Sequence, residues 1–143
     1  MIRMFREEAT SGFDMNDIET IPLENGLTVE VRDLSRTIAA DTTKVEILFS
    51  VAVPLHPEDC DCPAHYEMIR KVWGEAPRFE YRAARSFVRN KNVETAAREL
   101  REAFQRDSLS YLARPDFPRR FARAKYREIE TQPYRYREFL KEN

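Results

Sequence analysis

The stretch KVEILFSVAV, residues 44–53, decides the fold class of this chain. Apolar side chains stand at every second position, which is the period of a β-strand with one buried face. These side chains are Val45, Ile47, Phe49, Val51 and Val53. The proline at position 54 cannot donate a ladder hydrogen bond, so it would end the strand. The stretch therefore predicts a long central strand of a β-sheet.

Further strands are expected on both sides of this one. The sequence IPLENGLTVEV, residues 21–31, holds the turn residues Asn25 and Gly26 between two apolar runs, and both residue types tolerate positive φ. That pattern predicts a hairpin. Its first arm contains Pro22, which lacks an N–H donor, so we expect this arm to lie at the sheet edge. Apolar and polar residues also alternate over residues 79–87, which predicts a fourth strand.

Three helices are expected from their boundary residues and apolar spacing. Residues 63–73 would begin after Asp61 or Cys62 as N-cap, with Pro63 in the first turn, and would end at Gly74. The longest helix would span 93–113, and another would run from Pro118 to about residue 131. The element order β-β-β-α-β-α-α predicts an α+β fold, in which helices pack on one face of a small, mostly antiparallel sheet of about four strands.

The length of 143 residues suits one ordinary domain. We expect residues 1–16 to form a loosely ordered N-terminal arm and residues 17–143 to form a single α+β domain, because the first stretch lacks apolar periodicity and no linker follows it. No apolar run reaches the ~18–20 residues of a membrane span, and the start of the chain does not resemble a signal peptide. A cytoplasmic protein without a membrane partner is the expectation.

Charge is distributed unevenly along the chain. Residues 1–62 hold 5 basic and 13 acidic side chains, whereas residues 63–143 hold 19 basic and 12 acidic ones, although the whole chain has a net charge of −1. One interpretation is that complementary faces of the two parts, or of two copies, lie against each other. The other is that the basic part binds an external anionic partner.

The stretch LHPEDCDCPAH, residues 55–65, carries the residue types of a metal site. Imidazoles and thiolates are the ligands that zinc prefers, so zinc is the cofactor these side chains would suit. The candidate ligands are His56, Cys60, Cys62 and His65. The spacing argues against them, because Cys-X-Cys in an extended segment directs the two sulfurs to opposite sides. A reactive thiol at the helix start is a related hypothesis, which the surrounding acidic residues oppose.

The second candidate is a basic helix face at residues 118–130, in the stretch RPDFPRRFARAKYREIE at 114–130. Four arginines would gather on one side of the expected helix, and like charges four residues apart destabilise an isolated helix by a few tenths of a kcal/mol per pair. We call this set the arginine face: Arg119, Arg120, Arg123 and Arg127. An acidic protein surface or a second copy of the chain would therefore be expected to face it.

Nucleic acid is another anionic partner to consider, because aromatic residues interleave the arginines and could stack on bases. These aromatic residues are Phe117, Phe121, Tyr126, Tyr134 and Tyr136. However, the chain lacks a recognised nucleic-acid-binding motif, and the same positions are those that helical packing would bury.

Two segments, LENGLTVEVRDLSRTIAADTTKVEI at 23–47 and SLSYLARPDFPRRFARAKYRE at 108–128, resemble a family of short bacterial proteins with no assigned activity. The resemblance implies a bacterial, cytosolic protein and transfers no catalytic residue. The sequence also lacks a glycine-rich phosphate loop, and its two histidines both fall in the 55–65 stretch. We therefore expect a binding or interaction module rather than an enzyme, with no catalytic residues and no bound cofactor other than the zinc considered above.

Overall fold

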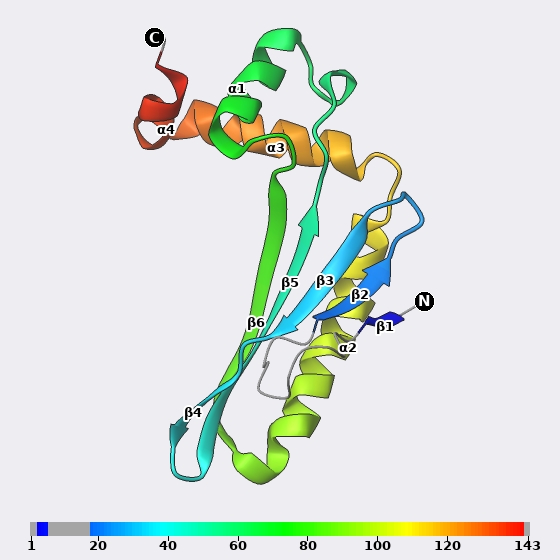
Figure 1. Ribbon diagram of the computed structural model, residues 1–143, viewed down its shortest axis with the longest axis vertical. Coiled ribbons are helices and arrows are strands. Elements are labelled where there is room, and N and C mark those ends of the chain that lie inside the picture. The colour runs from blue at the N-terminus through cyan, green and yellow to red at the C-terminus, as the bar shows by residue number, and fades with distance from the viewer. Residues whose placement is uncertain (1–2, 6–17, 142–143) are drawn as a thin grey trace. The chain divides into compact units, whose positions relative to one another are not determined.

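The computed structural model describes residues 3–5 and 18–141 of the chain (Figure 1). It confirms the α+β class and the antiparallel pairing of the sheet. The strands are β1 (Arg3–Phe5), β2 (Ile18–Pro22), β3 (Thr28–Asp33), β4 (Arg36–Ala39), β5 (Thr42–Ala52) and β6 (Arg78–Arg89). The helices are α1 (Pro63–Trp73), α2 (Val93–Leu112), α3 (Phe117–Thr131) and α4 (Pro133–Leu140), with single 3-10 turns at Pro57–Asp59 and Asn90–Asn92.

The chain divides into two compact units, a finer division than the single domain expected over residues 17–143. The first unit, which we call the sheet unit, comprises residues 1–51 and 80–113. The second, which we call the helical unit, comprises residues 52–79 and 114–143. Apart from β1, the expected N-terminal arm (residues 1–16) lies outside the described residues.

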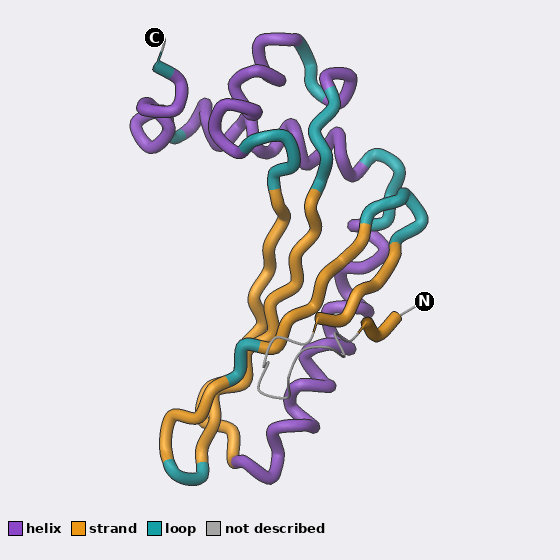
Figure 2. The backbone as a smooth tube through the Cα atoms, viewed as in Figure 1, coloured by secondary structure: helices purple, strands orange, loops and turns teal. Residues whose placement is uncertain are grey.

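The strand β5 forms the centre of the sheet, as its alternating sequence predicts. It pairs with β3 and β4 along one edge and with β6 along the other. The short strands β3 and β4 follow one another beside β5, because β3 pairs with residues 47–51 and β4 with residues 42–44. Figure 2 shows these strands as extended segments of the sheet unit. Val45, Ile47, Phe49 and Val51 are fully buried, which confirms the predicted face.

Helix α2 covers this apolar face of the sheet. The ring of Phe104 on α2 stacks on Phe49 of β5 with a centroid separation of 3.8 Å, and Tyr81 of β6 lies 6.1 Å from the same Phe104 ring. At the end of the helix, the side-chain amide of Asn25 donates a 2.9 Å hydrogen bond to the carbonyl of Leu112. The β2–β3 turn is thereby tied to α2.

The hairpin at residues 21–31 is present, and Gly26 adopts a φ of 92° in its turn. The expectation that its first arm lies at the sheet edge is wrong, because β1 pairs with the other side of β2. The β1 register runs from Ile18 to Thr20 and stops before Pro22. The proline is therefore accommodated because β1 is too short to require a donor at that position.

The three remaining helices pack on one another within the helical unit. Helix α1 contacts both α3 and α4, and α3 contacts α4. Their core contains Ile69 of α1, Ala122 and Ile129 of α3, and Tyr136 of α4, all of them buried. Helix α1 spans the predicted residues 63–73, with Cys62 as N-cap and Gly74, at a φ of 83°, as C-cap. The sequence predicted no helix or strand after residue 132, whereas the structure has helix α4 there.

Candidate functional site

Helix α3 presents the arginine face. Its packing side is apolar, with Phe121, Ala122 and Ile129 buried, so the four arginines of the arginine face are turned to the exposed side. The helix begins after Asp116, whose carboxylate accepts hydrogen bonds of 3.0 Å from Nε of both Arg114 and Arg120. These two bonds lower the pKa of Asp116 from 3.8 to about 2. Arg120 of the arginine face is therefore paired with Asp116 at the start of α3.

The 55–65 stretch is a connection between β5 and α1, with a single 3-10 turn at Pro57–Asp59. The carbonyl of Cys62 accepts the first helical hydrogen bonds of α1, from the backbone N–H groups of His65 and Tyr66. Because Cys62 rather than Asp61 occupies the cap position, the Asp61 carboxylate is left to interact elsewhere. It accepts a 3.1 Å hydrogen bond from Nε of Arg123 on α3.

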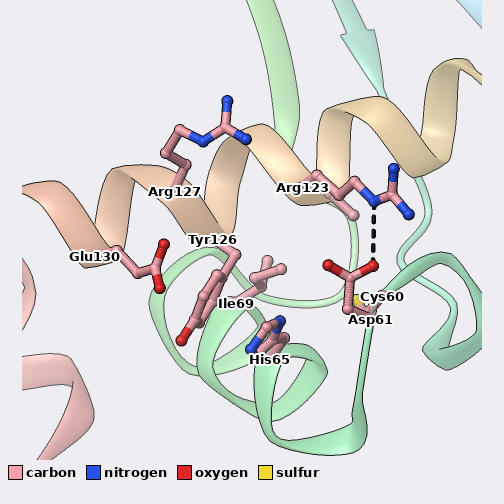
Figure 3. Close-up of a pocket in the computed structure, with 9 residues that line it drawn as sticks. Cys60, Asp61, His65, Ile69, Arg123, Tyr126, Arg127 and Glu130 are labelled. Carbon is pink, nitrogen blue, oxygen red and sulfur yellow. Dashed lines mark hydrogen bonds and ion pairs between the residues drawn. The ribbon is translucent and has the colours of Figure 1, made fainter.

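This ion pair joins the two candidate sites predicted from the sequence. Figure 3 shows Arg123 extending from α3 to Asp61, with Cys60 beside it. The two stretches together line a pocket of about 210 Å³ in the helical unit. Cys60 and His65 contribute from the first stretch, and Arg123 and Arg127 from the second. The two stretches, which the sequence analysis treated as separate candidates, therefore contribute to one pocket.

The pocket wall contains a stacked pair of rings. The imidazole of His65 lies on the phenol of Tyr126 with a centroid separation of 3.6 Å and an interplanar angle of 13°. Burial, together with the nearby Glu130 carboxylate, raises the pKa of Tyr126. The phenol therefore stays protonated at neutral pH, and the stack gives the pocket a flat, partly apolar wall. Ile69 and Ala122 line the pocket beside these rings.

The thiol of Cys60 is poorly suited to nucleophilic chemistry. The side chain is half-buried, and burial together with the charges of Asp59 and Asp61 raises the pKa of Cys60. A raised pKa keeps the sulfur protonated at neutral pH, whereas nucleophilic attack needs the thiolate. This is the effect that the acidic residues of the stretch led us to expect.

The predicted metal ligands are not gathered into a site. In residues 3–5 and 18–141, no group of three or more histidine, cysteine, aspartate or glutamate side chains is arranged to hold a metal ion. That range includes all four candidates, His56, Cys60, Cys62 and His65. Cys60 and His65 line the pocket, whereas His56 and Cys62 do not. The ring of His65 is stacked on Tyr126 instead. The geometry gives the zinc hypothesis no support.

The arginine face is only partly neutralised within the chain. Arg120 pairs with Asp116, and Arg123 pairs with Asp61, which belongs to the acidic first part of the sequence. Arg119 and Arg127 are exposed, and neither side chain has an ion-pair partner among the described residues. In Figure 3 the guanidinium of Arg127 points away from the stacked rings. Two cations therefore remain available on the surface beside the pocket.

Most of the aromatic residues that interleave the arginines are engaged in packing. Phe117, Phe121 and Tyr136 are buried, and Tyr126 is stacked on His65. Tyr134 is the exception, with 81% of its surface exposed. Four of the five rings considered for base stacking thus serve the core or the pocket wall.

No family model matches the chain, and no curated protein or solved structure is significantly similar to it. Within the described residues, no helix combines the length and apolarity that crossing a bilayer requires. The fold and the site together define an α+β protein with an arginine-flanked surface pocket.

The pocket also contains residues that sequence reasoning did not select. Asp61 was expected as a helix N-cap and Tyr126 as a packed or base-stacking ring, and Ile69 and Glu130 were not singled out, whereas all four line the pocket. Nothing in the local spacing connects position 61 with position 123. Only the packing of α1 against α3 brings them together.

Proposed function

We propose that this protein is a binding module whose arginine face takes up an acidic segment of a protein partner. The observation that carries the proposal is the exposed, unpaired state of Arg119 and Arg127 on either side of Arg123, which already holds a carboxylate. Guanidinium groups suit carboxylates, because their planar donors match the two carboxylate oxygens. The Asp61–Arg123 pair is a carboxylate–guanidinium contact within the chain, and a partner would make further contacts of the same kind with Arg119 and Arg127.

The spacing of the arginines fits an acidic helix. Residues 119, 123 and 127 are four apart, so they recur about every 6 Å along α3. Carboxylates at the same four-residue spacing on a partner helix would lie opposite them. Each exposed ion pair contributes only about 0.2–1 kcal/mol, so binding would need several pairs together with contacts at the pocket. Charge would chiefly set the association rate and the choice of partner.

Two other anionic partners remain as alternatives. A second copy of the chain could offer an acidic surface to the arginine face, and nucleic acid could offer phosphates. The acidic segment is favoured over nucleic acid because most of the interleaved rings are occupied, which leaves little to stack on bases. A bound metal at residues 56–65 stays a hypothesis for which the described geometry offers no ligand cluster.

Fluorescence anisotropy would test the proposal directly. The probe is a dye-labelled helical peptide with glutamate at every fourth position, compared with a labelled single-stranded oligo-dT. The test variant is Arg119→Ala/Arg127→Ala. The control is Arg98→Ala/Arg106→Ala, which removes the same charge from two exposed arginines of α2. We expect the test variant to weaken peptide binding about tenfold, which corresponds to ~1.4 kcal/mol, and the control to leave it unchanged.

Three outcomes would contradict the proposal. If both double variants weaken binding equally, net charge rather than the arginine face is responsible. If the wild-type protein binds oligo-dT more tightly than the peptide at equal salt concentration, the nucleic-acid alternative replaces the acidic segment. If neither probe binds even at low ionic strength, where surface electrostatics are strongest, the arginine face is simply solvated.

A further inference from the structure

The strand β6 (Arg78–Arg89) forms a long open edge of the sheet. It is 12 residues long and pairs with β5 on one side, and no described strand pairs with its other side. Figure 1 shows β6 beside β5 at this margin of the strands. Unpaired strand edges present a row of N–H and C=O groups that can add another strand. This surface differs from the arginine face and lies outside the function proposed above.

The hydrogen bonds around β5 show which groups of β6 point outward. The carbonyl of Glu46 accepts the N–H of Leu34 on the β3 side, whereas the N–H of Val53 donates to the carbonyl of Pro77 on the β6 side. In an antiparallel ladder these directions alternate along each strand. Within residues 80–86 of β6, the residues that direct both backbone groups toward the open edge are therefore Glu80, Arg82, Ala84 and Ser86.

Of the features that natural proteins use to block strand addition, this edge has charged side chains and one irregular residue but lacks others. The sequence RFEYRAARSFVR contains no proline and no lysine. Its irregularity is at one end, where Phe87 adopts a φ of 59°. The middle consists of the small residues Ala83 and Ala84. The charges that remain are mostly arginines, so a second strand must be placed where these arginines do not face one another.

One self-pairing register meets this condition. If two copies of β6 pair antiparallel with Ala83 opposite Ala83, then Arg82 lies opposite Ala84, and Glu80 lies opposite Ser86. The outward backbone groups of both copies then form the hydrogen-bonded pairs, and Ala83 occupies a closely spaced pair that a small side chain fits. Centring the pairing on Arg82 instead would place two arginines opposite each other, which is destabilising.

The other neighbouring register, centred on Ala84, is less suitable. It would extend the paired stretch past Ser86, so that Tyr81 would lie opposite the irregular residue Phe87. Centring on Ala83 keeps residues 80–86 paired and leaves Phe87 outside this stretch. It also places the half-exposed ring of Tyr81 opposite Arg85 of the second copy, whose charge is balanced by Glu99 of its own chain.

We propose that two copies of this chain form a dimer through antiparallel pairing of their β6 strands, centred on Ala83. The exposed edge supplies the backbone hydrogen bonds, and the charge pattern selects the register. Each copy keeps its own arginine face, so self-association and binding of an acidic segment use separate surfaces.

Substitutions at residue 84 test the register by sedimentation equilibrium. The side chain of Ala84 is exposed, and in this register it faces Arg82 of the second copy at two symmetry-related places. Ala84→Glu should tighten the dimer and Ala84→Lys should loosen it, each by roughly two- to thirtyfold. Circular dichroism would confirm that both variants are folded. The Arg119→Ala/Arg127→Ala variant should dimerise like the wild type, which separates this proposal from the previous one.

Cross-linking supplies a second measurement. In a Cys60→Ser/Cys62→Ser background, Ala83→Cys places one thiol opposite its counterpart and should form an interchain disulfide in air. The matched control Arg85→Cys should not, because its counterpart is Tyr81. The proposal is overturned if the wild type is monomeric at all concentrations, if the two residue-84 variants shift the equilibrium in the same direction, or if the two cysteine variants cross-link equally.

Discussion

Glu46 lies in the middle of β5, on the face opposite the apolar row, and is only 7% exposed. Its carboxylate accepts a 2.7 Å hydrogen bond from Arg82 and a 3.3 Å bond from Arg36, with Lys44 at 3.8 Å. The hydrogen bond from Arg82 is the main reason that the pKa of Glu46 lies below its ordinary value of 4.5, despite the opposing effect of burial. A buried charge is thus stabilised by three cations.

We expect Glu46→Gln to destabilise the protein by about 1–3 kcal/mol at pH 7, because it removes the charge that these cations share. A lowered pKa in the folded state contributes stability above pH 4.5 that is lost as the pH falls below this value. The difference between wild type and variant should therefore be constant from pH 7 to about pH 5 and shrink at lower pH. Urea unfolding at several pH values measures it.

Glu99→Gln is a matched control for this prediction. Glu99 pairs with Arg85 at 2.7 Å, but both side chains are 48% exposed. Exposed pairs contribute about 0.2–1 kcal/mol at most, so this variant should be close to wild type at every pH. Equal destabilisation by both variants would show that burial of Glu46 is not what makes its ion pairs strong.

At the scale of elements, β6 contains a local irregularity that alternation alone did not reveal. The sequence placed Phe87 on the buried face with Phe79 and Tyr81, whereas the structure leaves 78% of its surface exposed. Hydrogen bonds join Val53 to Pro77 and Asn90 to Asp41, and between them β6 has one residue more than β5. Phe87, with its φ of 59°, is the residue at which a bulge absorbs this extra length.

A left-handed conformation disfavours a side chain with a Cβ by roughly 1–2 kcal/mol. We therefore expect Phe87→Gly to be more stable than Phe87→Ala by up to about 1 kcal/mol, since both lose the exposed ring and only glycine relieves the backbone. Thermal unfolding of the two variants side by side measures this difference. If alanine is the more stable of the two, the conformation of Phe87 is not strained.

The elements themselves were largely predictable, because their signals are local. Pro63 and Gly74 bound α1 at the predicted residues, and Pro118 lies in the first turn of α3. The strands that the sequence did not predict depend on pairing with other strands. The sequence predicted no strand at β1, which is three residues long and pairs with β2. Likewise the sequence predicted no strand at β4, which forms by pairing with the start of β5.

At the scale of the whole molecule, the chain crosses between the sheet unit and the helical unit at residues 51/52, 79/80 and 113/114, and the first two crossings fall within β5 and β6. Because these two crossings lie within strands, no linker separates the two units there. We therefore expect one cooperative transition. The chain contains a single tryptophan, Trp73, which packs in the helical unit, so its fluorescence reports on that unit, while far-ultraviolet circular dichroism reports on both.

Phe104→Ala tests this expectation. It removes the ring stacked on Phe49 in the sheet unit and should destabilise the protein by about 3–5 kcal/mol. With one cooperative transition, the midpoints measured by Trp73 fluorescence and by circular dichroism should fall together in urea. Ile69→Ala, in the core of the helical unit, is the reciprocal variant. A Trp73 midpoint that does not move in Phe104→Ala would show that the two units unfold separately.

The sequence by itself determined the class of fold, the central strand and the three principal helices, because alternation, helical spacing, proline and glycine act over a few residues. It also identified both stretches that meet at the candidate site. Only the tertiary structure decided that Asp61 and Arg123 form one ion pair, that His65 stacks on Tyr126, and that Arg119 and Arg127 stay unpaired. These facts depend on how α1 packs against α3, and contacts between residues sixty positions apart leave no periodic signal in a single sequence.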